Sequence, residues 1–417
     1  MSRIVGTFYN AVALPAMAMW LRAASLVNRK MRQRGHEEPL AIQRALLLNK
    51  STTRVLFHAA SMGELEQCVP IMHSLTKLHP RVELFVSSTS PSGHAHAQSL
   101  DEVRCAVYQP IDTKRNVRKY LDVVKPDAIV IDRYDVWPNF IAEAHRREIS
   151  IHLVNATMPS AALNRFLRIW VRGFYRLLTT ITAVDARDQE YLSELTGLVV
   201  DTLPDTRIDR VIERIGAPSE LILQLKRDML ITVIVGSSWP ADEDLIFKAI
   251  SSINDPQLRL IVAPHEPTEA AVSRIEEHLS ITRLSNATQE TREHIVVDSV
   301  GSLLSLYAIA DAAFVGGGFG SGVHSVTEPA VHGIPIASGP HTERSRDARS
   351  LEAANVLHKV ASIDDAITWL RTIVLDPQRR TEVGERARAF FRNRSGSSEL
   401  YAHTIASSLN EQPRSSE

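Results

Sequence analysis

Short apolar runs alternate with helix-length segments along most of this 417-residue chain, and this alternation constrains the fold more than any other feature. A continuous apolar run next to a helix is typical of a strand that is buried on both faces of a parallel sheet. The pattern starts at residue 54, stops near "LPDTRIDRVIERIGAP" and then starts again. Because one sheet of about a dozen strands would be unusually large, we expect two α/β domains joined near residues 203–220. The runs interpreted as strands are "RVLFHAAS", "VELFVSST", "DAIVID", "SIHLVNA" and "ITAVD", then "LITVIVGSS", "LRLIVAPH", "HIVVDS", "AAFVGGG" and "PIASGP".

Two Rossmann-like domains of this kind would face each other across a cleft at the carboxyl ends of their parallel strands, where doubly wound sheets bind ligands. That architecture is typical of GT-B glycosyltransferases. It also occurs in sugar epimerases, so the expected α/β fold does not fix the chemistry. The chemistry has to be inferred from particular residues.

The first 35 residues depart from the composition of the remainder. "IVGTFYNAVALPAMAMWLRAASLV" carries few charges, and "NRKMRQRG" follows with four basic residues. A signal peptide is disfavoured because no small-residue cleavage site precedes the basic run. A spanning helix is disfavoured because Thr7, Asn10 and Pro15 interrupt the apolar sequence. We favour a membrane anchor at residues 1–35, with Trp20 and the basic run at the lipid headgroups; the alternative is a helix buried against the core.

Composition excludes several classes of protein. The formal net charge of -1 gives no global case for nucleic-acid binding. Cys68 and Cys105 are too few for a disulfide framework and fit a reducing compartment. Asp132 and Asp135 lack the spacing of a DxD pair, and the 16 histidines are scattered. We therefore expect no metal site and no resident cofactor.

A glycine-rich stretch, "GGGFGSGVHSVTEPAVHGIPIASGP" at residues 316–340, holds seven of the 18 glycines. It follows an expected strand and includes the start of a helical pattern, so its backbone N–H groups could bind a phosphate. Glu328, inside that helix, could reach a sugar hydroxyl. The alternative is a glycine-rich turn in which Glu328 only favours the helix dipole. The candidate donor-binding residues here are Gly317, Gly318, Gly320, Gly322, His324, Ser325 and Glu328.

A second candidate is "HAASMGELEQ", where Ser61 and Gly63 lie between an expected strand and a helix. Glu64 would sit at this junction and face the cleft. A carboxylate there can act as general base on an acceptor hydroxyl within hydrogen-bond reach. The alternative, equally supported by the spacing, is a first-turn glutamate that favours the helix dipole.

Polar residues also follow three other expected strands. Asp135 comes after "DAIVID", and Pro138 suits the first turn of the next helix. Ser237 and Ser238 end a strand of the second half and could donate to a phosphate or sugar. His265 could contact a nucleotide, although a loop histidine without a ligand is the simpler interpretation.

As an ordered series, these stretches resemble the 3-deoxy-D-manno-octulosonic acid (Kdo) transferases that act on lipid A. "HAASMGE" matches the family pattern H-x-x-S-x-G-E, and "RYDVWPN" resembles E-x-E-L-W-P-N. The glycine-rich stretch resembles G-G-x-x-x-x-G-x-H-N-x-x-E-P-A. The other similar stretches are "LVNAT", "PDTRIDRV", "GSSWPADED" and "VDSVGSLLSLYAIADAAFVGGG". The similarity runs in order from about residue 54 to residue 345.

The resemblance implies a metal-independent transfer of Kdo from CMP-Kdo to the lipid A precursor, at the cytoplasmic side of the bacterial inner membrane. Glu64 would be the general base, and Ser61, Gly63 and Asp135 would lie on the acceptor side. The segment 318–328 would bind the CMP phosphate. The implied domains are an anchor (1–35), an acceptor domain (36–205), a CMP-Kdo domain (206–395) and a C-terminal helix with a polar tail (396–417).

Several positions depart from the family pattern. Ser325 replaces an asparagine, Arg133 replaces the first acid of E-x-E, and Ser302 replaces an acid after D-x-x-G. His265 stands where the family has arginine. A GT-B enzyme with another nucleotide sugar or acceptor, a UDP-sugar 2-epimerase and a catalytically silent relative therefore remain alternatives.

Overall fold

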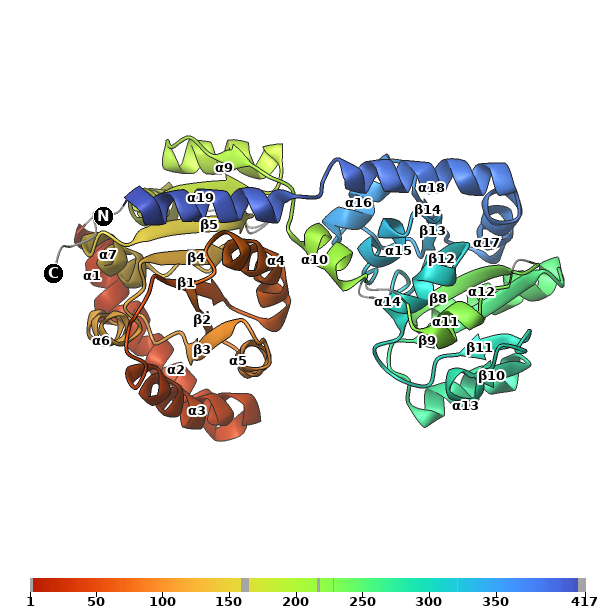
Figure 1. Ribbon diagram of the computed structural model, residues 1–417, viewed down its shortest axis with the longest axis horizontal. Helices are drawn as coiled ribbons and strands as arrows, with labels where there is room; N and C mark the ends of the chain where they lie inside the picture. The colour runs from red at the N-terminus through yellow and green to blue at the C-terminus, as the bar shows by residue number, and fades with distance from the viewer. Residues whose placement is uncertain (1–2, 159–164, 216–217, 228, 321, 412–417) are drawn as a thin grey trace. The chain divides into compact units, whose positions relative to one another are not determined.

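The chain folds into two compact α/β units in the computed structural model, which describes residues 3–158, 165–215, 218–227, 229–320 and 322–411. The first unit comprises Met1–Arg210 and Ser395–Glu417, and the second comprises Val211–Arg394. Their described residues form one seven-stranded sheet each, with every strand pair parallel. The expectation of two Rossmann-like domains with parallel sheets is confirmed, and Figure 1 shows helices around each sheet.

The sheet of the first unit has the order β3-β2-β1-β4-β5-β6-β7. Its strands are β1 (Arg54–Ala59), β2 (Glu83–Ser88), β3 (Val103–Tyr108), β4 (Ala128–Asp132), β5 (Ser150–Ala156), β6 (Thr180–Ala183) and β7 (Asp201–Thr202). The helices are α1 (Arg3–Phe8), the π-helical turn η1 (Tyr9–Ala13), α2 (Leu14–Val27), α3 (Arg29–Leu46), α4 (Met62–Leu78), α5 (Pro91–Gln98), α6 (Lys114–Val124), α7 (Pro138–Arg146), α8 (Arg165–Tyr175), α9 (Ala186–Thr196) and α19 (Ser397–Glu411). Helix α10 (Arg207–Arg214) includes the boundary between the two units in the sequence.

The sheet of the second unit has the order β10-β11-β9-β8-β12-β13-β14. Its strands are β8 (Ile231–Ser238), β9 (Leu258–Pro264), β10 (Ile281–Arg283), β11 (His294–Val296), β12 (Ala312–Val315), β13 (Ile336–Ser338) and β14 (Leu357–Lys359). The helices and turns are α11 (Glu220–Gln224), α12 (Pro240–Ile253), α13 (Glu269–His278), η2 (Leu284–Asn286), α14 (Leu303–Leu306), η3 (Tyr307–Ile309), α15 (Thr327–Val331), α16 (Arg346–Ala353), α17 (Ile363–Trp369), η4 (Leu370–Val374) and α18 (Pro377–Arg392).

The apolar runs are continuous because both faces of each sheet are covered. Along β1, Val55 and Phe57 pack on one face, and Leu56 packs on the other. Side chains alternate between faces along a strand, so a strand covered on both sides needs an apolar residue at nearly every position. All six residues of β1 are buried.

Helix α19 belongs to the first unit although it lies at the end of the chain. Tyr401 and Ile405 are buried in the same core cluster as Leu65 and Met72 of α4. Figure 1 shows α19 along the sheet of this unit. The C-terminal segment thereby covers strands that were formed by residues far earlier in the sequence.

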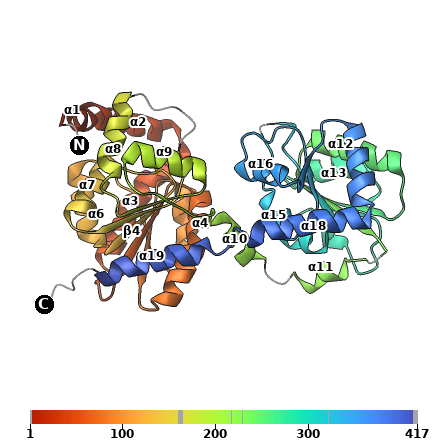
Figure 2. The same cartoon turned by 90° about the horizontal axis from the view of Figure 1, so that it is seen from above.

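The N-terminal helices also pack on the first unit. The hydroxyl of Tyr9 donates to Asp112 Oδ2 at 2.8 Å, and the ring of Tyr9 lies 5.4 Å from that of Trp170 in α8, between centroids. Figure 2 shows α8 beside α1 and α2. In the part of the chain that the structure describes, no helix is long and apolar enough to cross a membrane. Arg34 of the basic run donates to the carbonyl oxygens of Thr89 and Gln109, at the carboxyl ends of β2 and β3.

Candidate active site

The sheet order creates one switch point in each unit, where neighbouring strands connect in opposite directions. In the first unit it lies between β1 and β4, and in the second between β8 and β12. Open α/β sheets bind their ligands outside the carboxyl ends of the strands at such points. The candidate residues follow those strand ends: Ser61, Gly63 and Glu64 after β1, Asp135 after β4, Ser237 and Ser238 at the end of β8, His265 after β9, and Gly317 to Glu328 after β12.

Two hydrogen bonds hold Glu64 at the start of α4. Ser61 is the N-cap residue, and its hydroxyl accepts from the Glu64 N–H at 3.3 Å. Glu64 Oε2 accepts from the Ala60 N–H at 2.7 Å. Within the described residues, the other oxygen, Oε1, has no protein hydrogen bond. One oxygen of Glu64 therefore contacts the backbone just before α4, and the second oxygen remains for a ligand.

Asp135 is fixed by a buried histidine of the neighbouring strand. His58 Nε2 lies 2.8 Å from Asp135 Oδ2, and His58 Nδ1 lies 2.6 Å from Ser87 Oγ on β2. Burial opposes ionisation of Asp135, but the hydrogen bond and the electrostatic interaction with His58 hold the pKa of Asp135 below its usual range. An ionised carboxylate therefore stands beside the end of β1, next to the segment that carries Glu64.

The role of Arg133, which has a positive φ of 62°, was not predictable from the sequence. Its guanidinium donates to Gln67 Oε1 at 3.0 Å and to Asp205 Oδ2 at 2.9 Å. Asp132 Oδ2 lies 3.9 Å from Arg133 Nε. Burial raises the pKa of Asp132 to about 8, although Arg133 and Asn155 oppose this. The cation that replaces the family acid therefore compensates two neighbouring carboxyl groups.

Asn155 and Thr206 extend this network. Asn155 Nδ2 donates to Asp132 Oδ1 at 2.8 Å and to Thr206 Oγ1 at 2.7 Å. The Thr206 hydroxyl donates to the carbonyl oxygen of Gln67 at 2.7 Å, and the Asn155 N–H donates to Tyr401 Oη at 3.1 Å. The motifs "LVNAT" and "PDTRIDRV" thus brace the end of the sheet around α4. Their likeness to family motifs was visible in the sequence, but this role was not.

In the second unit, Asp242 of α12 joins the loops that follow β8 and β12. Its Oδ2 accepts from the Trp239 N–H at 2.9 Å and from the Gly317 N–H at 3.0 Å. The Ser238 hydroxyl is buried and donates to Glu243 Oε1 at 2.8 Å, so its proton already has an acceptor. Ser237, in a left-handed conformation with φ 52°, is only partly buried.

Close backbone packing explains several glycines of the loop. A Cβ at Gly316 would lie 2.4 Å from the Ser237 carbonyl oxygen, and one at Gly318 would lie 2.6 Å from the Gly339 nitrogen. Gly317 and Gly322 have φ values of 90° and 136°, which favour glycine. Gly320 has only an ordinary contact, at 3.7 Å.

Several backbone donors of the loop are also used internally. The N–H groups of Gly317, Gly320, Gly322 and His324 donate to Asp242 or to carbonyl oxygens of the loop itself. Contact between the loop and a phosphate stays a prediction. The donors for such a contact would be the other N–H groups of the segment 318–328.

Glu328 and Ser325 contact each other at the start of α15. Burial raises the pKa of Glu328, against the effects of Arg214 and the hydrogen bond from Ser325. The serine that replaces the family asparagine therefore donates to the glutamate, which had been predicted to hold a sugar hydroxyl.

Three aromatic rings meet near this loop. His265 and His324 stack with centroids 4.3 Å apart, and Trp239 stacks on His265 at 4.9 Å. Trp239 Nε1 donates to His324 Nε2 at 3.0 Å. The predicted residues His265 and His324 thus lie together, and Trp239 is a neighbour that the sequence did not single out.

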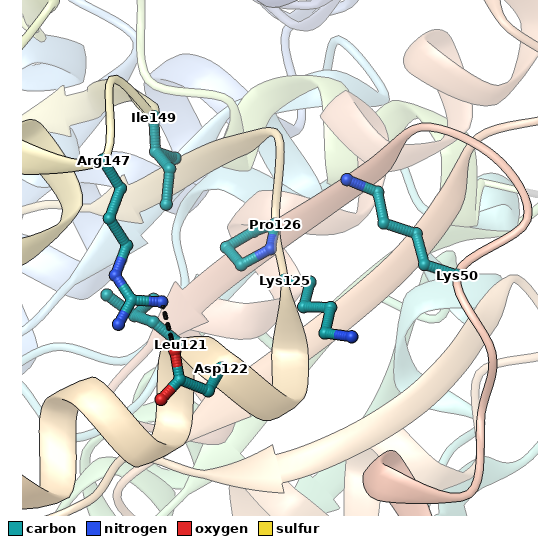
Figure 3. A pocket seen from close by; sticks show the side chains of 7 residues that line it. All are labelled: Lys50, Leu121, Asp122, Lys125, Pro126, Arg147 and Ile149. Carbon is teal, nitrogen blue, oxygen red and sulfur yellow. Dashed lines mark ion pairs between the residues drawn. The ribbon is translucent and has the colours of Figure 1, made fainter. Parts of the chain in front are cut away.

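A pocket of about 380 Å³ lies elsewhere in the first unit, before the amino ends of β1, β4 and β5. Two of its cations are paired. Lys50 pairs with Asp127 at 2.6 Å. Arg147 pairs with Asp122 at 2.9 Å, as Figure 3 shows. The pocket is therefore at the amino ends of the strands, whereas Glu64 follows the carboxyl end of β1. Within the described ranges, no three His, Cys, Asp or Glu residues are grouped as a metal site would need.

Two doubly wound units define a two-domain α/β protein of the GT-B-like class, and known structures support this. A UDP-GlcNAc 2-epimerase from Neisseria meningitidis aligns with a TM-score of 0.57 at 14% identity, covering 86% of this chain and 100% of that one. Acinetobacter baumannii MurG aligns with a TM-score of 0.54 at 14% identity, covering 85% and 100%. These similarities establish the fold alone.

Sequence comparison indicates one family within this structural class. The family model for 3-deoxy-D-manno-octulosonic acid transferase (kdotransferase) matches residues 30–210. The Chlamydophila psittaci enzyme of that name is 27% identical over 310 residues, 70% of each chain. Those of Haemophilus influenzae and Bordetella pertussis are each 25% identical, covering 69% and 81% of this chain and 71% and 83% of theirs. The comparisons therefore support a relationship of this chain to the Kdo transferase family.

Proposed function

We propose that this protein transfers Kdo from CMP-Kdo to a hydroxyl of the lipid A precursor, with Glu64 as the general base. The observation that carries the proposal is the way in which the Glu64 carboxylate is held by a hydrogen bond to only one of its oxygens. Oε2 is fixed by the Ala60 N–H at 2.7 Å, so the group is oriented at the end of β1 while Oε1 remains for an acceptor hydroxyl. Similarity to Kdo transferases over about 70–80% of the chain supports the sugar and the reaction class.

The proposed reaction is a single displacement. Glu64 takes the proton of the acceptor hydroxyl while that oxygen forms a bond to the anomeric carbon of Kdo. The bond from this carbon to the phosphate oxygen breaks, and CMP leaves with the electron pair. A positioned general base contributes about 10²–10⁴-fold to such a step. Since CMP carries one phosphate, the metal clamp used for diphosphate leaving groups is not required.

The donor would bind to the second unit. The backbone of the segment 318–328, which follows β12 beside the switch point of this unit, would lie against the CMP phosphate. Glu328 would accept from a sugar hydroxyl, and Ser237, His265 and His324 would contribute polar contacts.

Attachment to the cytoplasmic face of the inner membrane is part of the proposal. Phe8, Val12 and Met19 are 60%, 50% and 68% exposed on consecutive helical segments. Apolar side chains exposed along a helix favour shallow insertion into a lipid surface. Such attachment would bring the first unit to an acceptor whose acyl chains stay in the bilayer.

The test is transfer from CMP-Kdo, generated in situ because it hydrolyses, to a tetraacylated lipid A precursor. Wild-type protein should form product, and Glu64→Gln should reduce the rate by about 10²–10⁴-fold. Glu66→Gln, the same substitution two residues further along α4, is the matched control. Product from UDP-GlcNAc, or equal rates for wild type and folded Glu64→Gln, would contradict the proposal.

A further inference from the structure

The indole of Trp239 makes an edge-to-edge contact with the imidazole of His324. Trp239 Nε1 lies 3.0 Å from His324 Nε2, and the two ring planes differ by only 16° with their centroids 6.5 Å apart. Trp239 is 44% exposed, so its indole is not held in this orientation by burial in the core. The hydrogen bond is the specific contact that fixes the two rings relative to each other.

His265 covers one face of this ring pair. Its imidazole stacks on His324 at 4.3 Å with an interplanar angle of 14°, and on Trp239 at 4.9 Å with an angle of 27°. The three rings follow β8, β9 and β12, which are neighbours in the sheet. The cluster therefore stands at the carboxyl ends of β9, β8 and β12, beside the switch point between β8 and β12.

The hydrogen bond has a chemical consequence for His324. An indole N–H can only donate, so His324 Nε2 must be the acceptor and must carry no proton. A neutral imidazole with an unprotonated Nε2 carries its proton on Nδ1. Burial, and then the neighbouring His265, lower the pKa of His324, which agrees with a neutral ring.

The backbone around Gly317 closes off the Nε2 edge of the ring. A Cβ at Gly317 would lie 2.9 Å from His324 Cδ2 and 3.1 Å from Nε2. With Trp239 and Gly317 against this edge, Nε2 has no room for a ligand. The remaining polar atom of the ring is Nδ1, whose N–H is a hydrogen-bond donor.

We propose that Trp239 is a positioning residue that holds His324 in its neutral Nδ1–H tautomer, so that Nδ1 donates to an anionic oxygen of the bound nucleotide sugar. The identity of that ligand rests on the proposed function, whereas the tautomer follows from the contacts of Trp239 alone. A donor fixed before the substrate arrives costs no reorganisation when the ligand binds.

The first test is a ¹⁵N NMR measurement of the full-length protein labelled at histidine, at about pH 8, above the usual histidine pKa of about 6.5. His324→Gln identifies the resonances of His324. We expect wild-type His324 to be protonated at Nδ1 and unprotonated at Nε2. Trp239→Phe keeps an aromatic ring but removes the N–H, and it should shift the population toward the Nε2–H tautomer.

Trp369→Phe is the matched control, because the indole N–H of Trp369 is buried without a hydrogen-bond partner in the same unit. It should leave the His324 tautomer unchanged. Wild-type His324 with its proton on Nε2 would overturn the proposal. A folded Trp239→Phe protein with an unaltered tautomer would overturn it as well.

The second test is kinetic. Trp239→Phe should raise the KM for CMP-Kdo by about threefold to tenfold, the value of one hydrogen bond, while Trp369→Phe should not. An unchanged KM in Trp239→Phe would overturn the contact with the donor. Wild-type protein without transferase activity would remove the proposed function, and the NMR result, which needs no substrate, would still decide the tautomer.

Discussion

Arg133 and Asp205 form an ion pair of 2.9 Å that joins the end of β4 to the segment before α10. Arg133 stands where the Kdo transferase pattern has an acid, directly after the buried Asp132. Its guanidinium also contacts Gln67, three residues beyond Glu64 on α4. The charge reversal therefore does not remove acidic groups from the site: Asp132 and Asp205 both lie beside the new cation.

Arg133→Met should destabilise the protein by about 1–3 kcal/mol. The pair is mostly buried, with side-chain exposures of 13% and 17%, so removing Arg133 leaves Arg207, 3.1 Å away, as the remaining cation that pairs with Asp205. Urea unfolding monitored by circular dichroism measures the difference.

A double-mutant cycle with Asp205→Asn separates this pair from the loss of packing. The two changes should be less damaging together than the sum of their separate effects, by about 1 kcal/mol or more. Strict additivity would show that the ion pair does not stabilise the fold.

Asp132→Asn should gain stability relative to wild type as the pH rises. Burial raises the pKa of Asp132 to about 8 in the folded protein, against about 3.9 in the unfolded chain. Between these values the folded state binds more protons than the unfolded state, so the contribution of Asp132 to stability falls with increasing pH. Asparagine has no proton to lose, and its side-chain oxygen can still accept from Asn155.

Thermal unfolding of both proteins at about pH 5 and about pH 8 provides the measurement. The melting temperature of Asp132→Asn minus that of wild type should be higher by a few degrees at the higher pH. A difference that stays constant, or shrinks, would contradict the buried neutral state of Asp132.

Much of the fold was predictable because it depends on local pattern. Strands covered on both faces, such as β1 and β4, are continuous apolar runs, and their alternation with helices indicated two parallel sheets. The places of the candidate site residues after β1, β4, β8 and β12 were also predictable, because each of them comes directly after an apolar run. What the pattern does not contain is contact between distant residues: Arg133 meets Asp205 72 positions later, and Trp239 meets His324 85 positions later.

The glycine-rich loop illustrates the same limit. A glycine can permit close approach of a ligand or of another part of the chain, and the sequence does not distinguish the two. Gly318 meets the backbone of Gly339, whereas Gly320 does not pack closely. The N-terminal helices are a further case, because their composition did not reveal that Tyr9 would bond to the buried Asp112.

Gly318→Ala and Gly320→Ala should separate packing from ligand binding in this loop. A Cβ at Gly318 would lie 2.6–2.8 Å from three backbone atoms of Gly339, so we expect a loss of about 1–3 kcal/mol. Gly320 has space for a methyl group, and its substitution should change stability by less than about 0.5 kcal/mol. Chemical denaturation measures both.

Binding of CMP by isothermal titration calorimetry supplies the second readout. If the loop contacts the phosphate near Gly320, Gly320→Ala should weaken CMP binding while the protein remains as stable as wild type. Unchanged affinity would exclude a close approach of the ligand at that position.

Asp209 should control the stability of α19, although it belongs to α10. Its carboxylate accepts from the N–H groups of Gly396 and Ser398 at 2.7 and 2.8 Å, and from the Ser397 hydroxyl at 3.1 Å. The first N–H groups of a helix have no acceptors within the helix. The Asp209 carboxylate, which lies elsewhere in the chain, is an acceptor for the N–H groups at the start of α19. Asp209→Ala should therefore cost about 1–2 kcal/mol and release the first turn of α19.

Hydrogen–deuterium exchange tests this locally. In Asp209→Ala, exchange should accelerate most in residues 397–411, and then around Asn155, whose N–H donates to Tyr401 of α19. Ser362→Ala is the matched control, because it removes the N-cap of α17 in the other unit. That variant should leave exchange in α19 at the wild-type rate. Equal exchange of α19 in wild type and Asp209→Ala would mean that packing of Tyr401 and Ile405 against α4 holds the helix without its cap, because those buried contacts are unaffected by the substitution.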